Sequence, residues 1–204
     1  MGGSSDQFGA RPAVLRCSRC GKYVDWENAQ VQVVCTCRPH LDLPPVFVRE
    51  ATNVDRPAAR ELFERDFGRT RIVAFGEVMD LEQMPALVAL MGDEIAGALA
   101  YRTHGDALHI VALATDPMWQ RSGVGGQLIA EAELLGRRLG LTRLVVATTN
   151  DNLPALYFYQ RRGYRLTDFV ANSVMTHTGR EVLGFGGIPV RDEIRLEKNL
   201  TDPT

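Results

Sequence analysis

Residues 116–140, DPMWQRSGVGGQLIAEAELLGRRLG, place three glycines within four positions directly before a long amphipathic run. In that run apolar residues recur at helical spacing and Gly140 is a typical stop signal, so the pattern predicts a helix with bare backbone at its N-terminus. Free N–H groups and the helix dipole make such a position an anion site that needs no lysine. The apolar positions are Val124, Leu128, Ile129, Ala132, Leu135 and Leu139.

Two familiar nucleotide-binding loops do not fit these glycines. A P-loop needs Lys and then Ser or Thr after its last glycine, whereas Gly126 is followed by Gln127 and Leu128. A dinucleotide fingerprint needs a glycine where Leu128 stands, and the preceding strand lies in a meander instead of opening a strand–helix–strand unit. The remaining expectation is an anion cradle from Gln120 to Gly126 that fits a pyrophosphate.

The rest of the chain from residue 46 onward predicts a mixed α/β fold with a central, mostly antiparallel sheet and helices on both faces. Upstream we expect a strand at 46–51, a helix that Asn53 or Asp55 caps and Gly68 ends, and three strands within 85–117. Downstream we expect a strand at 143–149, a helix at 153–162, and strands at 164–170 and 192–200. Segments 69–85 and 177–191 show no regular periodicity.

All four cysteines lie within residues 17–37, as C-x2-C, a 14-residue spacer and C-x-C. The spacer reads as a hairpin that brings the two cysteine pairs together. Four converging thiolates suit a structural Zn²⁺, and so short a segment needs metal to fold. We therefore expect a flexible N-terminus at 1–12, a zinc-ribbon-like β-hairpin module at 13–40 and a proline-rich linker at 41–45 before the main domain at 46–204. The predicted zinc ligands are Cys17, Cys20, Cys35 and Cys37.

Other interpretations of this N-terminal segment stay open. A redox dithiol lacks the strand–helix–strand pattern that accompanies such motifs, and His40 is a reserve metal ligand. The local basic excess is too small to favour nucleic acid, so a protein partner or a role in positioning the substrate is at least as well supported.

The composition is that of a soluble globular protein, with 45% hydrophobic and 24% charged residues and a net charge of -2. This balance gives no global attraction to nucleic acid or to anionic lipid. The longest apolar stretches are far shorter than the roughly 18 residues of a membrane span, and the first residues lack the pattern of a signal peptide. We therefore expect a cytoplasmic protein with no membrane partner.

Two motifs resemble the Gcn5-related N-acetyltransferase (GNAT) family. QRSGVG, residues 120–125, matches the family's pyrophosphate loop, Gln/Arg-x-x-Gly-x-Gly/Ala, at Gln120, Gly123 and Gly125. NLPALYFYQRRGY, residues 152–164, matches the family's later motif at Asn152, Ala155, Phe158, Tyr159, Gly163 and Tyr164. The resemblance spans about residues 46 to 170, in order, and implies a GNAT-like fold with acetyl-CoA as cosubstrate.

The resemblance also implies which residues bind the cofactor. In such a fold two central strands splay apart, and the pantetheine arm lies between them against the backbone of Leu113, Ala114 and Thr115. Asn152 and Ala155 hold the arm from the other side, and Tyr159 lies at its thioester end. The pyrophosphate would bind to the loop formed by Gln120, Arg121, Ser122, Gly123, Val124, Gly125 and Gly126.

The same resemblance implies two catalytic residues. His109 stands where several family members place the base that removes a proton from the acceptor amine. It could also be a packed strand residue, and Asp106, Glu77 and His104 are alternative bases. Tyr159 is the family-matched acid for the departing thiolate, and its alternative role is that of a core aromatic residue.

These expectations combine into an acetyl-CoA-dependent N-acetyltransferase acting on a primary amine of a small molecule, peptide or protein by direct attack. Segments 69–85 and 177–191 are expected to line the acceptor side. The alternative is a non-catalytic, acyl-CoA-responsive binding protein whose zinc module contacts a protein or nucleic acid. Acetyl or a longer acyl group, and a monomer or a homodimer, both remain open.

Overall fold

The structure is a computed structural model that describes residues 44–174 and 182–201. The predicted zinc module, with Cys17, Cys20, Cys35 and Cys37, lies outside these residues. Within the described ranges, no helix is long and apolar enough to cross a membrane.

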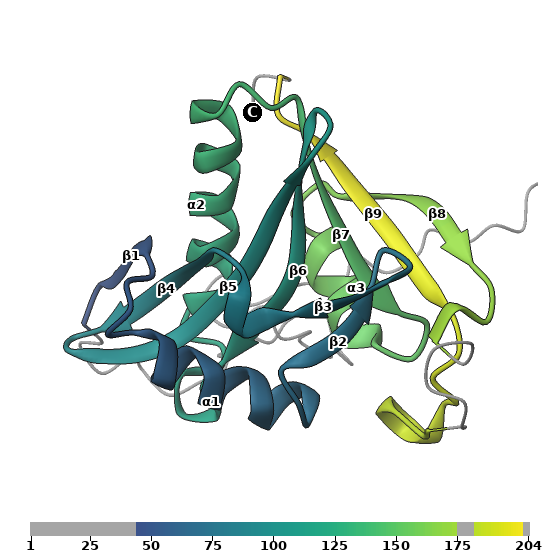
Figure 1. Ribbon diagram of the computed structural model, residues 1–204, viewed down its shortest axis with the longest axis horizontal. Helices are drawn as coiled ribbons and strands as arrows, with labels where there is room; N and C mark the ends of the chain where they lie inside the picture. The colour runs from purple at the N-terminus through teal and green to yellow at the C-terminus, as the bar shows by residue number, and fades with distance from the viewer. Residues whose placement is uncertain (1–43, 175–181, 202–204) are drawn as a thin grey trace, which may run out of the picture. The chain divides into compact units, whose positions relative to one another are not determined.

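A seven-stranded sheet forms the centre of the domain (Figure 1). Its strand order is β1-β4-β5-β6-β7-β9-β8, and only β6 and β7 pair in parallel, which confirms the mixed, mostly antiparallel sheet. The strands are β1 (Val46–Glu50), β4 (Ala86–Met91), β5 (Glu94–His104), β6 (Ala107–Thr115), β7 (Arg143–Thr149), β8 (Arg165–Val170) and β9 (Glu193–Asn199).

Helices pack on both faces of the sheet, as the sequence predicts. One apolar cluster joins α2 (Val124–Arg138) and Tyr159 of α3 (Leu153–Gln160) to side chains such as Leu108 and Ile110 of β6. The other cluster joins α1 (Arg56–Phe67) to alanines and valines on the opposite face. Each fully buried leucine or isoleucine contributes about 1.5–3 kcal/mol, so these clusters hold the layers together.

The interval between α1 and β4 contains a hairpin that the sequence patterns did not predict. Residues 69–85 form β2 (Arg71–Ala74), β3 (Glu77–Asp80) and a short 3-10 turn at Leu81–Gln83. The turn between the strands has positive φ at both Phe75 (57°) and Gly76 (74°), the backbone of a two-residue hairpin turn. Phenylalanine is a rare choice at its first position, which is why Phe-Gly gave no turn signal.

Of the two expected N-cap residues of the first helix, Asn53 and Asp55, the structure has Asp55 at this position. Its side chain accepts no hydrogen bond from the helix and so does not make the expected capping hydrogen bond. Its carboxylate instead accepts bonds from the Thr52 backbone at 2.7 Å and from Arg49 at 2.6 Å. These hydrogen bonds, the Arg49 bond foremost, hold the pKa of Asp55 well below its usual range. Asp55 thus fastens the β1–α1 connection.

A bulge in β6 decides which way its side chains point. The register with β5 shifts so that Tyr101 pairs with Ile110 and Ala100 pairs with Ala112, leaving Val111 as the extra residue. Both Val111 and Ala112 therefore pack on the α1 face. His109 lies before the bulge and faces the same side, because its ring contacts Phe75 of the hairpin.

The parallel pairing of β6 with β7 is short. It runs from Ala107 with Arg143 to Ile110 with Val146 and stops there, although both strands continue. Beyond this point β6 keeps its β5 partner while β7 keeps β9. The two central strands therefore part at the end where α2 and α3 begin.

Candidate functional site

The predicted anion loop lies between β6 and α2. After Thr115, Asp116 starts a 3-10 turn by accepting the Met118 N–H at 2.8 Å, and the Ser122 hydroxyl donates to the Trp119 carbonyl. Gly123 is the N-cap residue of α2 with φ of 102°, a conformation that strains any side chain. Gln120, Arg121 and Ser122 lead into this glycine, and the first helical residues are Val124, Gly125 and Gly126. The Gln120 and Ser122 N–H groups donate to Pro117 and Trp119, and the glycines bring the backbone of residues 123–126 to the positive end of a four-turn helix.

Arg162, which follows α3, lies against this loop and was not among the predicted site residues. Its guanidinium nitrogen would come within 2.8 Å of a Cβ placed on Gly126. It stacks 3.7 Å over the Phe158 ring and donates one bond, to the Phe158 carbonyl. Among the described acidic residues none forms an ion pair with it, and burial lowers its pKa. An uncompensated cation beside an anion loop is suited to a phosphate.

The residues expected to hold the pantetheine arm lie where β6 and β7 part. Leu113, Ala114 and Thr115 follow the last β6–β7 pair. The Leu113 side chain lies 3.6 Å from the Cβ position of Gly125 and so joins the strand to the loop. Across the gap Asn152 caps α3, with its side-chain oxygen accepting the Ala155 N–H at 3.2 Å. The structure thus brings these residues and the loop to one end of the sheet.

Tyr159 lies in the core on the α2–α3 side. Its ring meets Phe158 and Tyr164 edge to face, with centroids 5.1 Å and 5.4 Å away, and only 4% of the residue is exposed. Burial raises the pKa of its phenol well above the usual range. The phenol therefore stays protonated throughout the physiological pH range, although its raised pKa makes it a weaker acid, and core packing fixes its position.

His109 lies on the opposite face, under the β2–β3 hairpin. Its ring stacks on Phe75 with centroids 4.2 Å apart and lies 5.3 Å from the ring of His104. Its Nδ1 is buried and has no hydrogen-bond partner among the described residues. Burial, followed by the nearby charges of Arg102 and His104, lowers the pKa of His109 to about 4. The imidazole is therefore neutral at pH 7.

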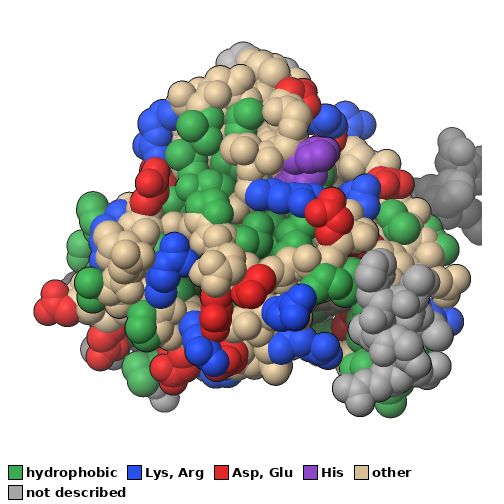
Figure 2. All heavy atoms as spheres, in the orientation of Figure 1, with side chains coloured by type: hydrophobic (Ala, Val, Ile, Leu, Met, Phe, Trp, Pro, Cys, Tyr) green, Lys and Arg blue, Asp and Glu red, His purple; other side chains and the backbone are tan. Residues whose placement is uncertain are grey.

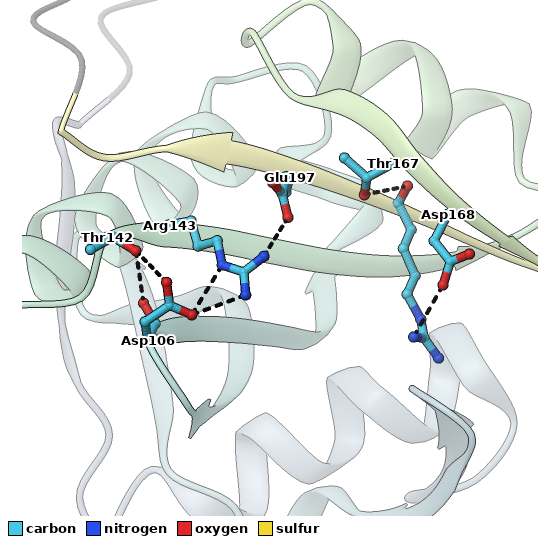
Figure 3. Close-up of polar contacts among 7 residues, drawn as sticks. Asp106, Thr142, Arg143, Thr167, Asp168 and Glu197 are labelled. Carbon is cyan, nitrogen blue, oxygen red and sulfur yellow. Dashed lines mark hydrogen bonds and ion pairs between the residues drawn. The ribbon is translucent and has the colours of Figure 1, made fainter.

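The alternative bases occupy three different settings. Glu77 is exposed and bound by Arg102 at 2.8 Å, which lowers its pKa. His104 lies beside His109 at the surface, where Figure 2 shows histidines among basic and acidic side chains. Asp106 is held by Thr142 and Arg143 in a network that reaches Glu197 (Figure 3). That network lies at the paired end of β6 and β7, away from the loop.

The described part of segment 177–191 packs against the start of α3. Asn150 donates to the Pro189 carbonyl and accepts the N–H groups of Arg191 and Asp192. Asp151 is 7% exposed, accepts the Phe185 N–H at 3.1 Å through Oδ2, and leaves Oδ1 without a partner among the described residues. Neither Asn150 nor Asp151 was predicted from the sequence, since contacts with so distant a segment leave no local pattern.

Asp66 is a further carboxylate near the gap. It lies at the end of α1, where burial raises its pKa and a hydrogen bond from the Thr115 backbone acts against that rise. No group of three or more His, Cys, Asp and Glu side chains in residues 44–174 and 182–201 has the arrangement of a metal site.

Comparisons with known proteins agree on one family and one fold. The family profile described as "Acetyltransferase (GNAT) family" matches residues 51–164. The chain is similar to the uncharacterized protein YxbD of Bacillus subtilis (strain 168), with 31% identity over 175 residues, 83% of this chain and 99% of YxbD.

Solved structures give the same result for the fold. One is the IAA acetyltransferase from Bacillus cereus ATCC 14579, with a TM-score of 0.61 and 23% identity over 76% of this chain and 99% of that one. Another is a Bacillus subtilis acetyltransferase in complex with CoA, with a TM-score of 0.59 and 24% identity over 77% of this chain and 98% of that one. At these identities the likeness concerns the fold.

Proposed function

Because the chain belongs to the acetyltransferase (GNAT) family, and so transfers acetyl groups from acetyl-CoA, we propose that its acceptor is a primary amine that attacks the thioester directly. The observation that carries the proposal is the meeting of the glycine loop and the parted ends of β6 and β7 at one end of the sheet. A glycine loop at a helix N-terminus can bind a pyrophosphate. The unpaired backbone groups of the parted strands can form hydrogen bonds with the amide groups of a pantetheine arm.

We propose the following roles for the cofactor-binding residues. The loop from Gln120 to Gly126 binds the pyrophosphate through backbone N–H groups, and Arg162 adds a positive charge. The backbone of Leu113–Thr115 and the side chain of Asn152 hold the pantetheine arm. The cosubstrate supplies an activated acetyl thioester, and the bound CoA of the Bacillus subtilis structure supports this assignment by analogy.

The proposed acid–base chemistry uses one residue from each face of the sheet. An alkylammonium of pKa about 10.4 must lose a proton before it can attack. His109 is neutral at pH 7 and so is free to accept that proton, but its pKa of about 4 makes it a weak base, so we propose that it passes the proton on to water. The nitrogen then bonds to the acetyl carbon, the carbon–sulfur bond breaks, and Tyr159 protonates the departing thiolate. The amide nitrogen and His109 release their extra protons to solvent, and one proton returns to Tyr159, so that one proton is released per acetyl group transferred.

Direct attack is favoured because no cysteine lies between residues 38 and 204 to carry the acetyl group. The β2–β3 hairpin and residues 182–191 are proposed to line the acceptor side. The hairpin covers His109, and residues 182–191 bind to the turn that precedes Asn152. Exposed Leu183 and Phe185 would give that side an apolar surface.

The decisive experiment measures release of free thiol from acetyl-CoA in the presence of a mixed library of amines and peptides, with products identified by mass spectrometry. Acetylated amines are expected with the wild type, and far less product with Tyr159→Phe. If thiol release is absent, or is the same in both proteins, the catalytic proposal is wrong. A non-catalytic acyl-CoA sensor would bind acetyl-CoA and show no difference in thiol release between the wild type and Tyr159→Phe. Nothing in the comparisons favours such a sensor.

We also propose that Cys17, Cys20, Cys35 and Cys37 bind one structural Zn²⁺. Support comes from their spacing alone, since they lie outside the described residues. Elemental analysis of purified protein is expected to give one zinc per chain and none after Cys17→Ser with Cys35→Ser. A metal-free wild type, purified without chelator, would contradict this proposal.

A further inference from the structure

The tip of the β2–β3 hairpin holds a bulky residue in an unfavourable conformation. Phe75 has φ of 57°, in the left-handed region that glycine or asparagine normally occupies. Backbone strain of this kind persists only where surrounding contacts hold it. Phe75 has such contacts with Glu193 and with His109.

A buried glutamate from a distant strand holds the backbone of this turn. Glu193, the first residue of β9, is 3% exposed and accepts the Phe75 N–H at 2.7 Å, across 118 residues of sequence. Its other oxygen accepts Arg195 Nε, also at 2.7 Å. A buried carboxylate is costly unless it is paired and hydrogen-bonded, and here both conditions are met. A simple hairpin tip would need neither the glutamate nor the arginine.

The ring of Phe75 lies over His109 and between two arginines. It stacks on the imidazole at 4.2 Å with an interplanar angle of 27°, and the guanidinium carbons of Arg102 and Arg195 lie 5.6 Å and 5.7 Å from its centre. Only 9% of Phe75 is exposed. The ring therefore covers one face of the imidazole and excludes water from it.

We propose that Glu193 and Phe75 are positioning residues for His109: the glutamate holds the turn in its left-handed conformation, and the phenylalanine ring then covers one face of the imidazole and shields it from water. The inference rests on the proposed role of His109 as the group that accepts the acceptor's proton. It adds a part of the site that no sequence motif marks, and it explains why a strained phenylalanine occupies the hairpin tip.

The basic groups around His109 act in the same direction as its burial. Arg102 and His104 face it from β5, Arg195 from β9 and Arg143 from β7, and each of them disfavours a protonated imidazole. The carboxylate of Glu77 on β3 acts in the opposite direction on His109 and is bound to Arg102 at 2.8 Å. Glu193 on β9 is bound to Arg195 at 2.7 Å.

The test is an NMR titration of the His109 imidazole in ¹⁵N-histidine-labelled full-length protein, with the signal assigned by its loss in His109→Gln. In the wild type we expect titration near pH 4. Phe75→Ala should raise the midpoint by about one pH unit or more, towards the ordinary value of about 6.5, because water reaches the ring. Glu193→Ala is compared with Glu193→Gln, since both remove the charge that pairs with Arg195 and only glutamine keeps an acceptor for the Phe75 N–H. The midpoint should be higher in Glu193→Ala than in Glu193→Gln.

The control is Val78→Ala, an exposed position on the same hairpin, which should leave the His109 titration unchanged. If His109 titrates at the wild-type pH in Phe75→Ala, and at the same pH in Glu193→Ala as in Glu193→Gln, the positioning proposal is wrong. Should Glu193→Ala fail to fold, Phe75→Leu against Phe75→Ala decides, since leucine covers the ring and alanine does not.

The titration needs no turnover, so it separates this proposal from the proposed function. If the midpoint moves in the variants while the acidic limb of kcat/KM against pH does not follow it, then the shielding is real and His109 is not the base. If both move together, the shielding serves catalysis.

Discussion

At the scale of single residues, Gln120, Gly123, Asn152 and Tyr159 could be proposed as site residues from the sequence because each occupies a fixed place in a short local pattern. Glu193, Asp151 and Arg162 could not, because their contacts cross the sheet or join separate helices. The sequence does not distinguish Arg162 from its neighbour Arg161. The Arg161 side chain is exposed and donates to the Tyr157 hydroxyl, whereas the Arg162 guanidinium lies beside Gly126 of the glycine loop.

Tyr159→Phe removes one hydroxyl and keeps the ring that packs against Phe158 and Tyr164. We expect kcat to fall by about 10²–10⁴-fold, the usual effect of losing a positioned acid, with little change in the affinity for acetyl-CoA. Steady-state kinetics and calorimetric titration with CoA measure the two quantities. A fall in CoA affinity with an unchanged kcat would assign Tyr159 to binding instead.

Arg162→Ala should weaken CoA binding about tenfold or more, since a charge-assisted hydrogen bond contributes about 1.5–3 kcal/mol. The loss should shrink at high salt, which screens the charge. Arg161→Ala is the matched control, because that side chain is exposed and bound to Tyr157. Isothermal titration at two salt concentrations checks the prediction, and equal losses in both variants would show a general charge effect.

At the scale of elements, the alternation of apolar residues predicted the seven strands of the main sheet and the three helices, with ends that differ by one or two residues. The helix expected at 153–162 ends at Gln160, and the strand expected at 46–51 ends at Glu50. The β2–β3 hairpin was missed because its strands have four residues each and its Phe-Gly turn lacks the usual residues. The bulge at Val111 is also not visible in the sequence pattern. The face of the sheet on which the His109 side chain lies could therefore be found only from the structure.

Gly97 of β5 couples the sheet to the start of the loop helix. A Cβ at this position would lie 2.7 Å from Val124 Cγ1 and 3.1 Å from both the Ala114 carbonyl and Leu128. Gly97→Ala should therefore push α2 away from the sheet and destabilise the protein by about 1–3 kcal/mol. Because Val124 is the first residue of α2, the affinity for CoA should fall as well. Thermal melts with and without CoA test both parts, and an unaltered melt would mean that α2 relaxes freely.

At the scale of the whole molecule, the sheet separates the two proposed catalytic residues. Tyr159 belongs to the cluster on the α2–α3 face and His109 lies under Phe75 on the α1 face. They can act on one substrate only where β6 and β7 stop pairing, after Ile110 and Val146. The sequence predicted the fold class without showing where the β6–β7 pairing ends, but the proposed arrangement of the site depends on that position.

The buried neutral His109 also makes stability depend on pH. Its folded-state pKa of about 4 lies below the usual 6.5, so between these values the unfolded chain binds the extra proton. The stabilisation is complete above pH 6.5 and is lost as the pH falls towards 4. The full shift would correspond to about 3 kcal/mol, which partial exposure of the ring reduces to about 1–2 kcal/mol.

Denaturant unfolding of the wild type and His109→Gln from pH 7 to pH 4 measures this contribution. The wild type should lose more stability than the variant over this range. Parallel losses in both proteins would mean that carboxylates such as Asp55, whose folded-state pKa is depressed, account for the acid sensitivity.

The parallel pairing of β6 with β7 ends after Ile110 and Val146, and this end of the pairing affects the stability of the folded protein. In the complex proposed above, the pantetheine arm would take the place of a missing strand partner, so that the cosubstrate would complete part of the sheet. A ligand that binds only the folded state adds about 2.7 kcal/mol at a concentration one hundred times its Kd. The melting temperature, and with it resistance to proteolysis, should therefore rise with the concentration of coenzyme A.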